Sequence, residues 1–190
     1  MELLKERIRA EGRVLNSEVL KVDSFLNHQV DPALMHAIGE EFARIFADSG
    51  VTRVATIESS GIAPALATAE KLGVPLLIMK KQTSRILSDD LIQCEVQSFT
   101  KSRRYQLTAS RKYIAPGDRV LVIDDFLAFG EAALGACSIV EQAGATVAGI
   151  GAVIEKAFQP GHDRLIKLGY NLHSLARVSR MAMGEIDFAE

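Results

Sequence analysis

Apolar positions recur along the chain with two different periods, and together they predict strands that alternate with helices. Asp31 and Pro32 indicate a helix start, and apolar residues at helical spacing continue as far as Gly50. The elements expected after it are strands at residues 51–57, 75–79, 119–123 and 146–154, and helices at residues 62–72 and 131–143. This alternation predicts an α/β fold with a parallel sheet covered by helices on both faces.

Residues 83–112 interrupt this alternation because they are polar, basic and only weakly periodic. Within them, residues 91–96 and 105–109 could pair as a hairpin. Since a long excursion from a compact domain is usually functional, we expect a flexible hairpin flap over residues 83–112.

Length and composition predict one compact domain. The chain has 190 residues, of which 48% are hydrophobic. No apolar run approaches the roughly 18 residues that span a bilayer, and the first residues mix acids with bases, unlike a signal peptide. We therefore expect a cytoplasmic protein with no membrane partner. Cys94 and Cys137 lie far apart and the histidines form no ligand cluster, so neither a disulfide framework nor a structural zinc site is expected.

The charge distribution is uneven although the net charge is only -2. Between Lys80 and Lys112 there are eight basic and three acidic residues, so this segment carries +5 and the remainder -7. This pattern favours a small, highly charged anion over a nucleic acid as the partner. A solvated basic loop would give the same local excess.

Ligands of parallel sheets bind at the carboxyl ends of the strands, which are expected here after Ile57, Ile123 and Ile154. Asp124 and Asp125 follow the predicted strand at 119–123, and paired carboxylates can accept hydrogen bonds from the 2- and 3-hydroxyls of a ribose.

The loop that follows the two aspartates leads into a predicted helix. Its residues are Ala128, Phe129, Gly130, Glu131 and Ala132, whose backbone N–H groups could hold a phosphate with the help of the helix dipole. A plain strand-to-helix turn with solvated acids is the alternative.

A second polar turn comprises Glu58, Ser59, Ser60 and Gly61, between a predicted strand and a predicted helix. Its N–H groups and hydroxyls could bind another anion. A helix-capping turn would have the same residues.

A hydrophobic run, two acids and then Ala-x-Gly-x-Ala resemble the ribose-phosphate motif of the type I phosphoribosyltransferases. Two residues depart from that motif: Phe129 replaces a hydroxyl residue or asparagine, and Glu131 places a negative charge beside the expected phosphate. Further segments extend the resemblance, specifically to the bacterial xanthine phosphoribosyltransferases, over nearly the full chain. They are residues 20–28, 56–64, 98–101, 123–128 and 154–161.

The resemblance implies an activity and an architecture. The activity would be transfer of 5-phosphoribosyl from phosphoribosyl pyrophosphate (PRPP) to xanthine, giving xanthosine 5'-monophosphate and pyrophosphate in purine salvage. Mg²⁺ would be held mainly by PRPP, without predicted protein ligands. The architecture would be a single phosphoribosyltransferase domain over residues 1–190, with a hood lobe from residues 1–30 and 155–190, assembled as a homodimer.

The resemblance also implies a role for each candidate residue. Asp124, Asp125 and Lys101 would be catalytic, with Lys101 and its neighbours 98–100 on the flap. PRPP would contact residues 128–132 and the turn 58–61. Xanthine would contact Leu20, Asn27, Lys156 and Phe126, where the Lys156 ammonium can donate to the 6-oxo group and N7 of the purine and Phe126 can stack on the ring. Taken alone, Lys156 would be a solvated lysine and Asn27 a turn residue.

Other functions of the same fold stay open at this point. A non-catalytic regulator could bind PRPP, and a related enzyme could act on hypoxanthine or guanine. The sequence has no spare length for a DNA-binding domain, which disfavours the regulator.

Overall fold

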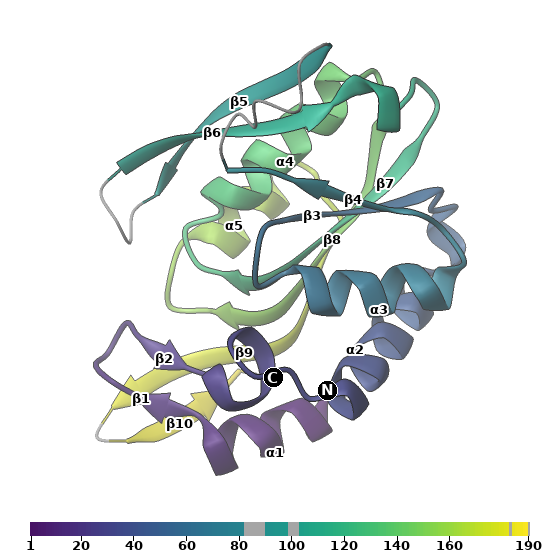
Figure 1. Ribbon diagram of the computed structural model, residues 1–190. Helices are drawn as coiled ribbons and strands as arrows, with labels where there is room; N and C mark the ends of the chain where they lie inside the picture. Colours follow the sequence, from purple (N-terminus) through teal and green to yellow (C-terminus); the bar gives the residue numbers. More distant parts are fainter. Residues whose placement is uncertain (82–89, 99–102, 183, 190) are drawn as a thin grey trace.

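The computed structural model describes residues 1–81, 90–98, 103–182 and 184–189. Its centre is a sheet of six strands in the order β10-β9-β8-β7-β3-β4 (Figure 1). Neighbours from β4 to β9 run parallel, and β10 pairs antiparallel with β9 at the edge. The bounds are β3 Arg53–Ile57, β4 Leu76–Met79, β7 Arg119–Leu127, β8 Thr146–Lys156, β9 Leu172–Ala182 and β10 Glu185–Phe188. The predicted α/β class is confirmed.

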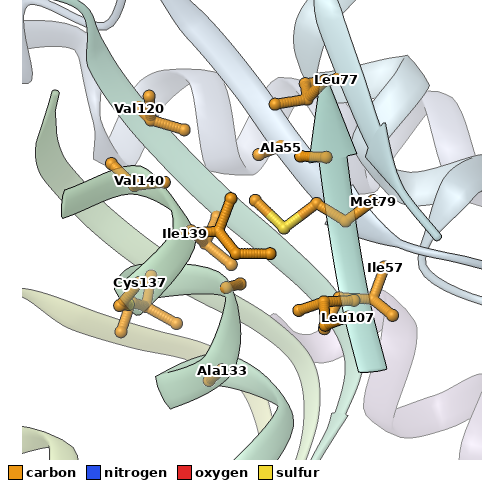
Figure 2. Packing of buried hydrophobic residues seen from close by; sticks show 14 of the residues in the cluster. Ala55, Ile57, Leu77, Met79, Leu107, Val120, Ala133, Cys137, Ile139 and Val140 are labelled. Atoms are coloured by element: carbon orange, nitrogen blue, oxygen red, sulfur yellow. The ribbon is translucent and has the colours of Figure 1, made fainter. Parts of the chain in front are cut away.

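Helices cover both faces of the sheet. Helix α4 (Glu131–Gln142) lies on one face, beneath the antiparallel hairpin of β5 (Leu91–Ser98) and β6 (Arg103–Ser110). Figure 2 shows side chains of α4 directed at apolar side chains from β3, β4 and β6 in one buried cluster. Helices α2 (Pro32–Ile45) and α3 (Ile62–Leu72) lie on the opposite face.

Local signals account for the ends of these two helices. The Asp31 carboxylate accepts hydrogen bonds from the N–H groups of Ala33 at 2.9 Å and Leu34 at 3.1 Å, which caps α2. Gly73 ends α3 with a φ of 67°, a left-handed conformation that glycine adopts readily. Both boundaries agree with the sequence-based prediction.

The N-terminal segment packs against the last strands of the sheet, and the two chain ends lie in this part of the molecule (Figure 1). It consists of α1 (Glu2–Glu11), the short strands β1 (Arg13–Val14) and β2 (Leu20–Lys21), and a π-helical turn η1 (Asp23–Asn27). The Met1 ammonium donates a hydrogen bond to the Leu175 carbonyl at 2.6 Å. Buried Leu4, Ile8 and Phe25 join the same apolar cluster as Ile123 of β7, so one core connects this segment with the sheet.

Two strands continue further than the sequence predicted. Strand β7 extends to Leu127 and β8 to Lys156, and Asp124 pairs with Ala152 within their ladder. The predicted end of β7 at Ile123 was wrong because the acids were taken to end the strand, whereas the ladder needs only backbone groups.

Short elements complete the fold. They are α5 (Gly161–Lys167) and the 3₁₀ turns η2 (Ala47–Ser49) and η3 (Arg111–Tyr113). No helix in the described part of the chain has both the length and the apolar character needed to cross a membrane.

Candidate active site

A cavity of about 200 Å³ lies beside the carboxyl end of β7, between the β7–α4 loop and the β5–β6 hairpin. Strand β7 contributes Asp124, Phe126 and Leu127, and the loop and first turn of α4 contribute residues 128–133. The hairpin contributes Val96, Gln97 and Tyr105, and Lys81 lines the cavity from beyond β4. All five residues of the predicted phosphate loop, 128–132, therefore line one cavity together with a predicted catalytic acid.

Asp124 and Asp125 are both half-buried, but only Asp124 is among the cavity-lining residues. The N–H of Asp125 donates to Asp124 Oδ1 at 3.0 Å, which fixes the Asp124 carboxyl group. Loss of solvation and then the negative charge of Asp125 raise the pKa of Asp124 well above its usual range. Such a perturbed carboxyl in a cavity is typical of functional sites.

The loop after β7 presents backbone N–H groups at the start of α4. Gly130 has a φ of 85°, and the first bond of the helix runs from the Leu134 N–H to the Gly130 carbonyl at 2.9 Å. The N–H groups of residues 130–133 precede this bond and have no acceptor within the helix. This is the arrangement that binds phosphate at helix N-termini.

The turn 58–61 lies directly beside Asp124. A Cβ added to Gly61 would lie 2.3 Å from Thr56 Oγ1 and 3.0 Å from Asp124 Oδ1, so glycine permits this close approach. The peptide bond between Glu58 and Ser59 is cis. The predicted second anion site and the acidic site are thus adjacent.

Two lysines flank this turn. Lys80 Nζ lies 3.1 Å from Glu58 Oε2, and the Lys81 N–H donates to Glu58 Oε1 at 2.9 Å. Partial burial would raise the pKa of Glu58, but the Lys81 N–H and the Lys80 ammonium together lower it. The positive charges next to the turn suit a polyanion such as pyrophosphate.

Lys156 ends β8 and contacts both the N-terminal segment and Phe126. Its ammonium donates to the Glu18 carbonyl at 2.6 Å and lies 5.6 Å from the centre of the Phe126 ring. Burial lowers the pKa of Lys156, opposed by the charge of Glu18. Leu20 is buried in β2, whereas Asn27 is exposed at the end of η1, so these two predicted contacts come from the same segment that holds Lys156.

The β5–β6 hairpin lies against α4. A Cβ added to Gly135 would lie 2.4 Å from Val96 Cγ2, which shows how closely the two elements pack. Burial and then the charge of Asp124 raise the pKa of Tyr105 to about 12, so this phenol stays protonated as it faces the cavity. Lys101 and residues 99–100 lie outside the described residues.

The arrangement of acid, loop and turn has counterparts among known proteins. Residues 24–170 match the family described as the phosphoribosyl transferase domain. The chain belongs to the phosphoribosyltransferase family. Among curated family members, a xanthine phosphoribosyltransferase of an Exiguobacterium species is 54% identical over all of this chain and 98% of its own. Xanthine phosphoribosyltransferase 1 of Clostridium botulinum is 56% identical over the whole of both chains.

Solved structures of phosphoribosyltransferases share the fold. The adenine phosphoribosyltransferase of Leishmania donovani superposes with a TM-score of 0.73 over 90% of this chain and 78% of its own, at 20% identity. The adenine phosphoribosyltransferase of Rhodothermus marinus superposes with a TM-score of 0.71 over 92% of this chain and 98% of its own, at 21% identity. These likenesses establish the fold of this family member.

Site residues of this phosphoribosyltransferase that were not singled out from the sequence include Lys80, Lys81, Tyr105 and Arg164. Lys80 and Lys81 were counted only within the basic segment. Tyr105 lay in the predicted hairpin, but the sequence did not indicate towards which side its side chain points. Arg164 contacts the Phe129 carbonyl of the predicted phosphate loop from α5, an element that the pattern of apolar residues did not predict.

Proposed function

We propose that this phosphoribosyltransferase transfers the 5-phosphoribosyl group of PRPP to xanthine, forming xanthosine 5'-monophosphate and pyrophosphate in purine salvage. The reaction class rests on one observation above all: Asp124 and the residues of the β7–α4 loop line the same cavity. The choice of base rests on relatives named xanthine phosphoribosyltransferase that are 54% and 56% identical over the full chain.

The loop and the acids hold the ribose phosphate. The N–H groups of residues 130–132 bind the 5-phosphate, with Ala128 and Phe129 completing the loop. Asp124 and Asp125 accept hydrogen bonds from the ribose hydroxyls. As positive charge develops on the ribose ring, nearby carboxylates stabilise the oxocarbenium-like transition state.

The turn 58–61 receives the pyrophosphate, with the ammonium groups of Lys80 and Lys81 nearby. A leaving pyrophosphate gathers negative charge, so fixed cations and N–H groups at this turn stabilise it. Closure of the segment 83–112, with Lys101 on it, would exclude water that otherwise attacks the activated sugar.

The donor set fits magnesium carried by the substrate. Asp124, Asp125 and Glu58 offer the hard carboxylate oxygens that magnesium prefers, and the family resemblance assigns most of its ligands to PRPP. When bound, magnesium neutralises charge on the pyrophosphate. The protein then contributes few direct ligands and PRPP the rest.

Base recognition falls to Lys156 and the N-terminal segment. The Lys156 ammonium donates to the 6-oxo group and N7 of xanthine, while Phe126 packs on the ring. Asn27 and the backbone at Leu20 contact the 2-oxo edge. An ammonium disfavours a 6-amino group, which separates xanthine from adenine.

Pyrophosphate release with PRPP, magnesium and each of xanthine, guanine, hypoxanthine and adenine tests this function. We expect the highest kcat/KM with xanthine. PRPP binding without turnover on any base would instead favour a regulator, and a preference for hypoxanthine or guanine would overturn the assignment of the base.

Substituting Lys156→Ala tests the base contact. It should lower kcat/KM for xanthine by roughly 10- to 150-fold, as expected for the loss of a charged hydrogen-bond donor worth about 1.5–3 kcal/mol. The loss for adenine should be smaller, because adenine offers this donor N7 but no 6-oxo group. Lys167→Ala, on the exposed side of α5, is the matched control. An unchanged ratio of xanthine to adenine use would show that Lys156 does not read the base.

We further propose that the enzyme acts in the cytoplasm as a homodimer. The resemblance to the family supports both proposals. The native mass from sedimentation equilibrium tests the dimer, since a monomer would give 20.7 kDa.

A further inference from the structure

Glu131 poses an electrostatic problem for phosphate binding. It is the first residue of α4 and lines the cavity together with the loop that precedes it. A carboxylate at this position would repel a phosphate dianion bound to the N–H groups of the same turn. Some other group must offset this charge if the loop is to hold the 5-phosphate.

Arg164 of α5 supplies the opposite charge. Its Nη1 atom donates to Glu131 Oε1 at 2.5 Å and to the Phe129 carbonyl at 2.7 Å. The Arg164 and Glu131 side chains are 40% and 26% exposed, so water screens this pair only partly. One guanidinium nitrogen thus binds both residues that depart from the family motif.

The contact with the Phe129 carbonyl also controls the direction of an N–H group. In a trans peptide the carbonyl of one residue and the N–H of the next point in opposite directions. Because Arg164 Nη1 holds the Phe129 carbonyl, the Gly130 N–H points away from the Arg164 guanidinium. Gly130, with a φ of 85°, would otherwise allow this peptide group to rotate.

Helix α5 is itself held firmly enough to serve as a support. The Gly161 N–H donates to the Ala128 carbonyl at 3.0 Å. His162 Nδ1 lies 3.0 Å from the buried Glu155 carboxylate, which also accepts from Arg177 at 2.9 Å. The helix is therefore fixed to the loop on one side and to β8 and β9 on the other.

We propose that Arg164 is a positioning residue for the 5-phosphate, which neutralises Glu131 and fixes the peptide between Phe129 and Gly130. This inference rests on the proposed function, because it assigns the loop to the phosphate of PRPP. It explains how the loop can carry Glu131 and still bind an anion.

A double-mutant cycle tests the proposal with Arg164→Gln, Glu131→Gln and the double variant. Arg164→Gln should raise KM for PRPP roughly tenfold, a difference of about 1.4 kcal/mol, with little change in KM for xanthine. Glu131→Gln in that background should recover most of the loss, because no uncompensated charge remains. Arg164→Lys should recover part, since lysine keeps the charge without the planar fork.

A control variant and a binding measurement separate this positioning role from a purely structural one. Arg44→Gln removes an exposed ion pair with Glu41 on α2 and controls for the loss of an arginine. Binding of ribose 5-phosphate by calorimetry reports on the loop without any turnover. If Arg164→Gln weakens that binding while no base is turned over, the proposed function fails and the role of Arg164 stands.

Equal increases in both KM values, with melting lowered in parallel, would overturn the role of Arg164. So would additive effects of the two substitutions, because the charge of Glu131 would then be irrelevant to the loss.

Discussion

Replacing Gly161 with alanine should damage the phosphate loop more than it damages the fold. An added Cβ would lie 2.3 Å from the Ala128 carbonyl oxygen, 2.9 Å from the Gly130 nitrogen and 3.0 Å from the Phe129 carbonyl carbon. All three are backbone atoms, so no side chain can rotate away. Since ordinary contacts begin near 3.4 Å, the loop and α5 must separate by about 1 Å.

The size of that displacement sets the expected magnitudes. Overpacking of this kind costs roughly 1–3 kcal/mol of stability. In a domain of this length each kcal/mol lowers Tm by about 2–4 °C. A misplacement of about 1 Å in a binding loop can cost on the order of 100-fold in activity. We therefore expect Gly161→Ala to fold, to melt several degrees lower and to lose roughly 100-fold in kcat/KM for PRPP.

Gly169→Ala is the control that separates strain from contact. Gly169 has a φ of 86° beyond the end of α5, and an added Cβ would meet nothing within 4 Å. Its left-handed backbone should cost alanine about 1–2 kcal/mol, without any change in KM for PRPP. The assays are thermal melting and initial rates at varied PRPP. If Gly161→Ala lowered Tm as Gly169→Ala does and left PRPP kinetics intact, the close contact would have no role in holding the loop.

Two further substitutions test the site and its support. Asp124→Asn should lower turnover by about 100-fold or more yet raise Tm at pH 7. The pKa of Asp124 is higher in the folded than in the unfolded protein, so its ionisation destabilises the fold as pH rises from the unfolded to the folded pKa. Thermal melting from pH 3 to 8 should therefore show that the higher Tm of Asp124→Asn disappears at the acidic end, where the carboxyl is protonated in both states. An unchanged Tm at pH 7 would contradict this expectation. Gly135→Ala would place a methyl 2.4 Å from Val96 Cγ2 and should cost about 1–3 kcal/mol in urea unfolding. Adding Val96→Ala should restore most of that loss, and no restoration would show that the clash lies elsewhere.

Local signals predicted much of the fold. Helix α3 was predicted at its observed bounds because its apolar spacing and the stop at Gly73 lie within the segment itself. The β5–β6 hairpin was also expected, at slightly shorter bounds. Helix α5 was not, since its seven residues span only two turns and Leu165 is its one buried large apolar residue. A period cannot be read from so short a segment.

The candidate site likewise contains parts that adjacent residues in the sequence indicate and parts that only the folded chain brings together. The loop at residues 128–132 and the turn 58–61 could be proposed as anion sites from the sequence because each is a run of adjacent residues. Lys80 and Lys81 reach the turn through strand pairing of β3 with β4, which a linear reading does not supply. The assignment of Lys101 stays a prediction.

The pairing of Arg164 with Glu131 explains why the departures from the motif looked more serious in the sequence than in the structure. A loop that binds through N–H groups needs a particular backbone more than particular side chains. Its sequence therefore tolerates Phe129 and Glu131, provided that something holds the carbonyl and neutralises the carboxylate. That support comes from Gly161 and Arg164, which belong to another element. Phosphate binding by this loop should accordingly depend on residues of α5 as strictly as on its own glycine.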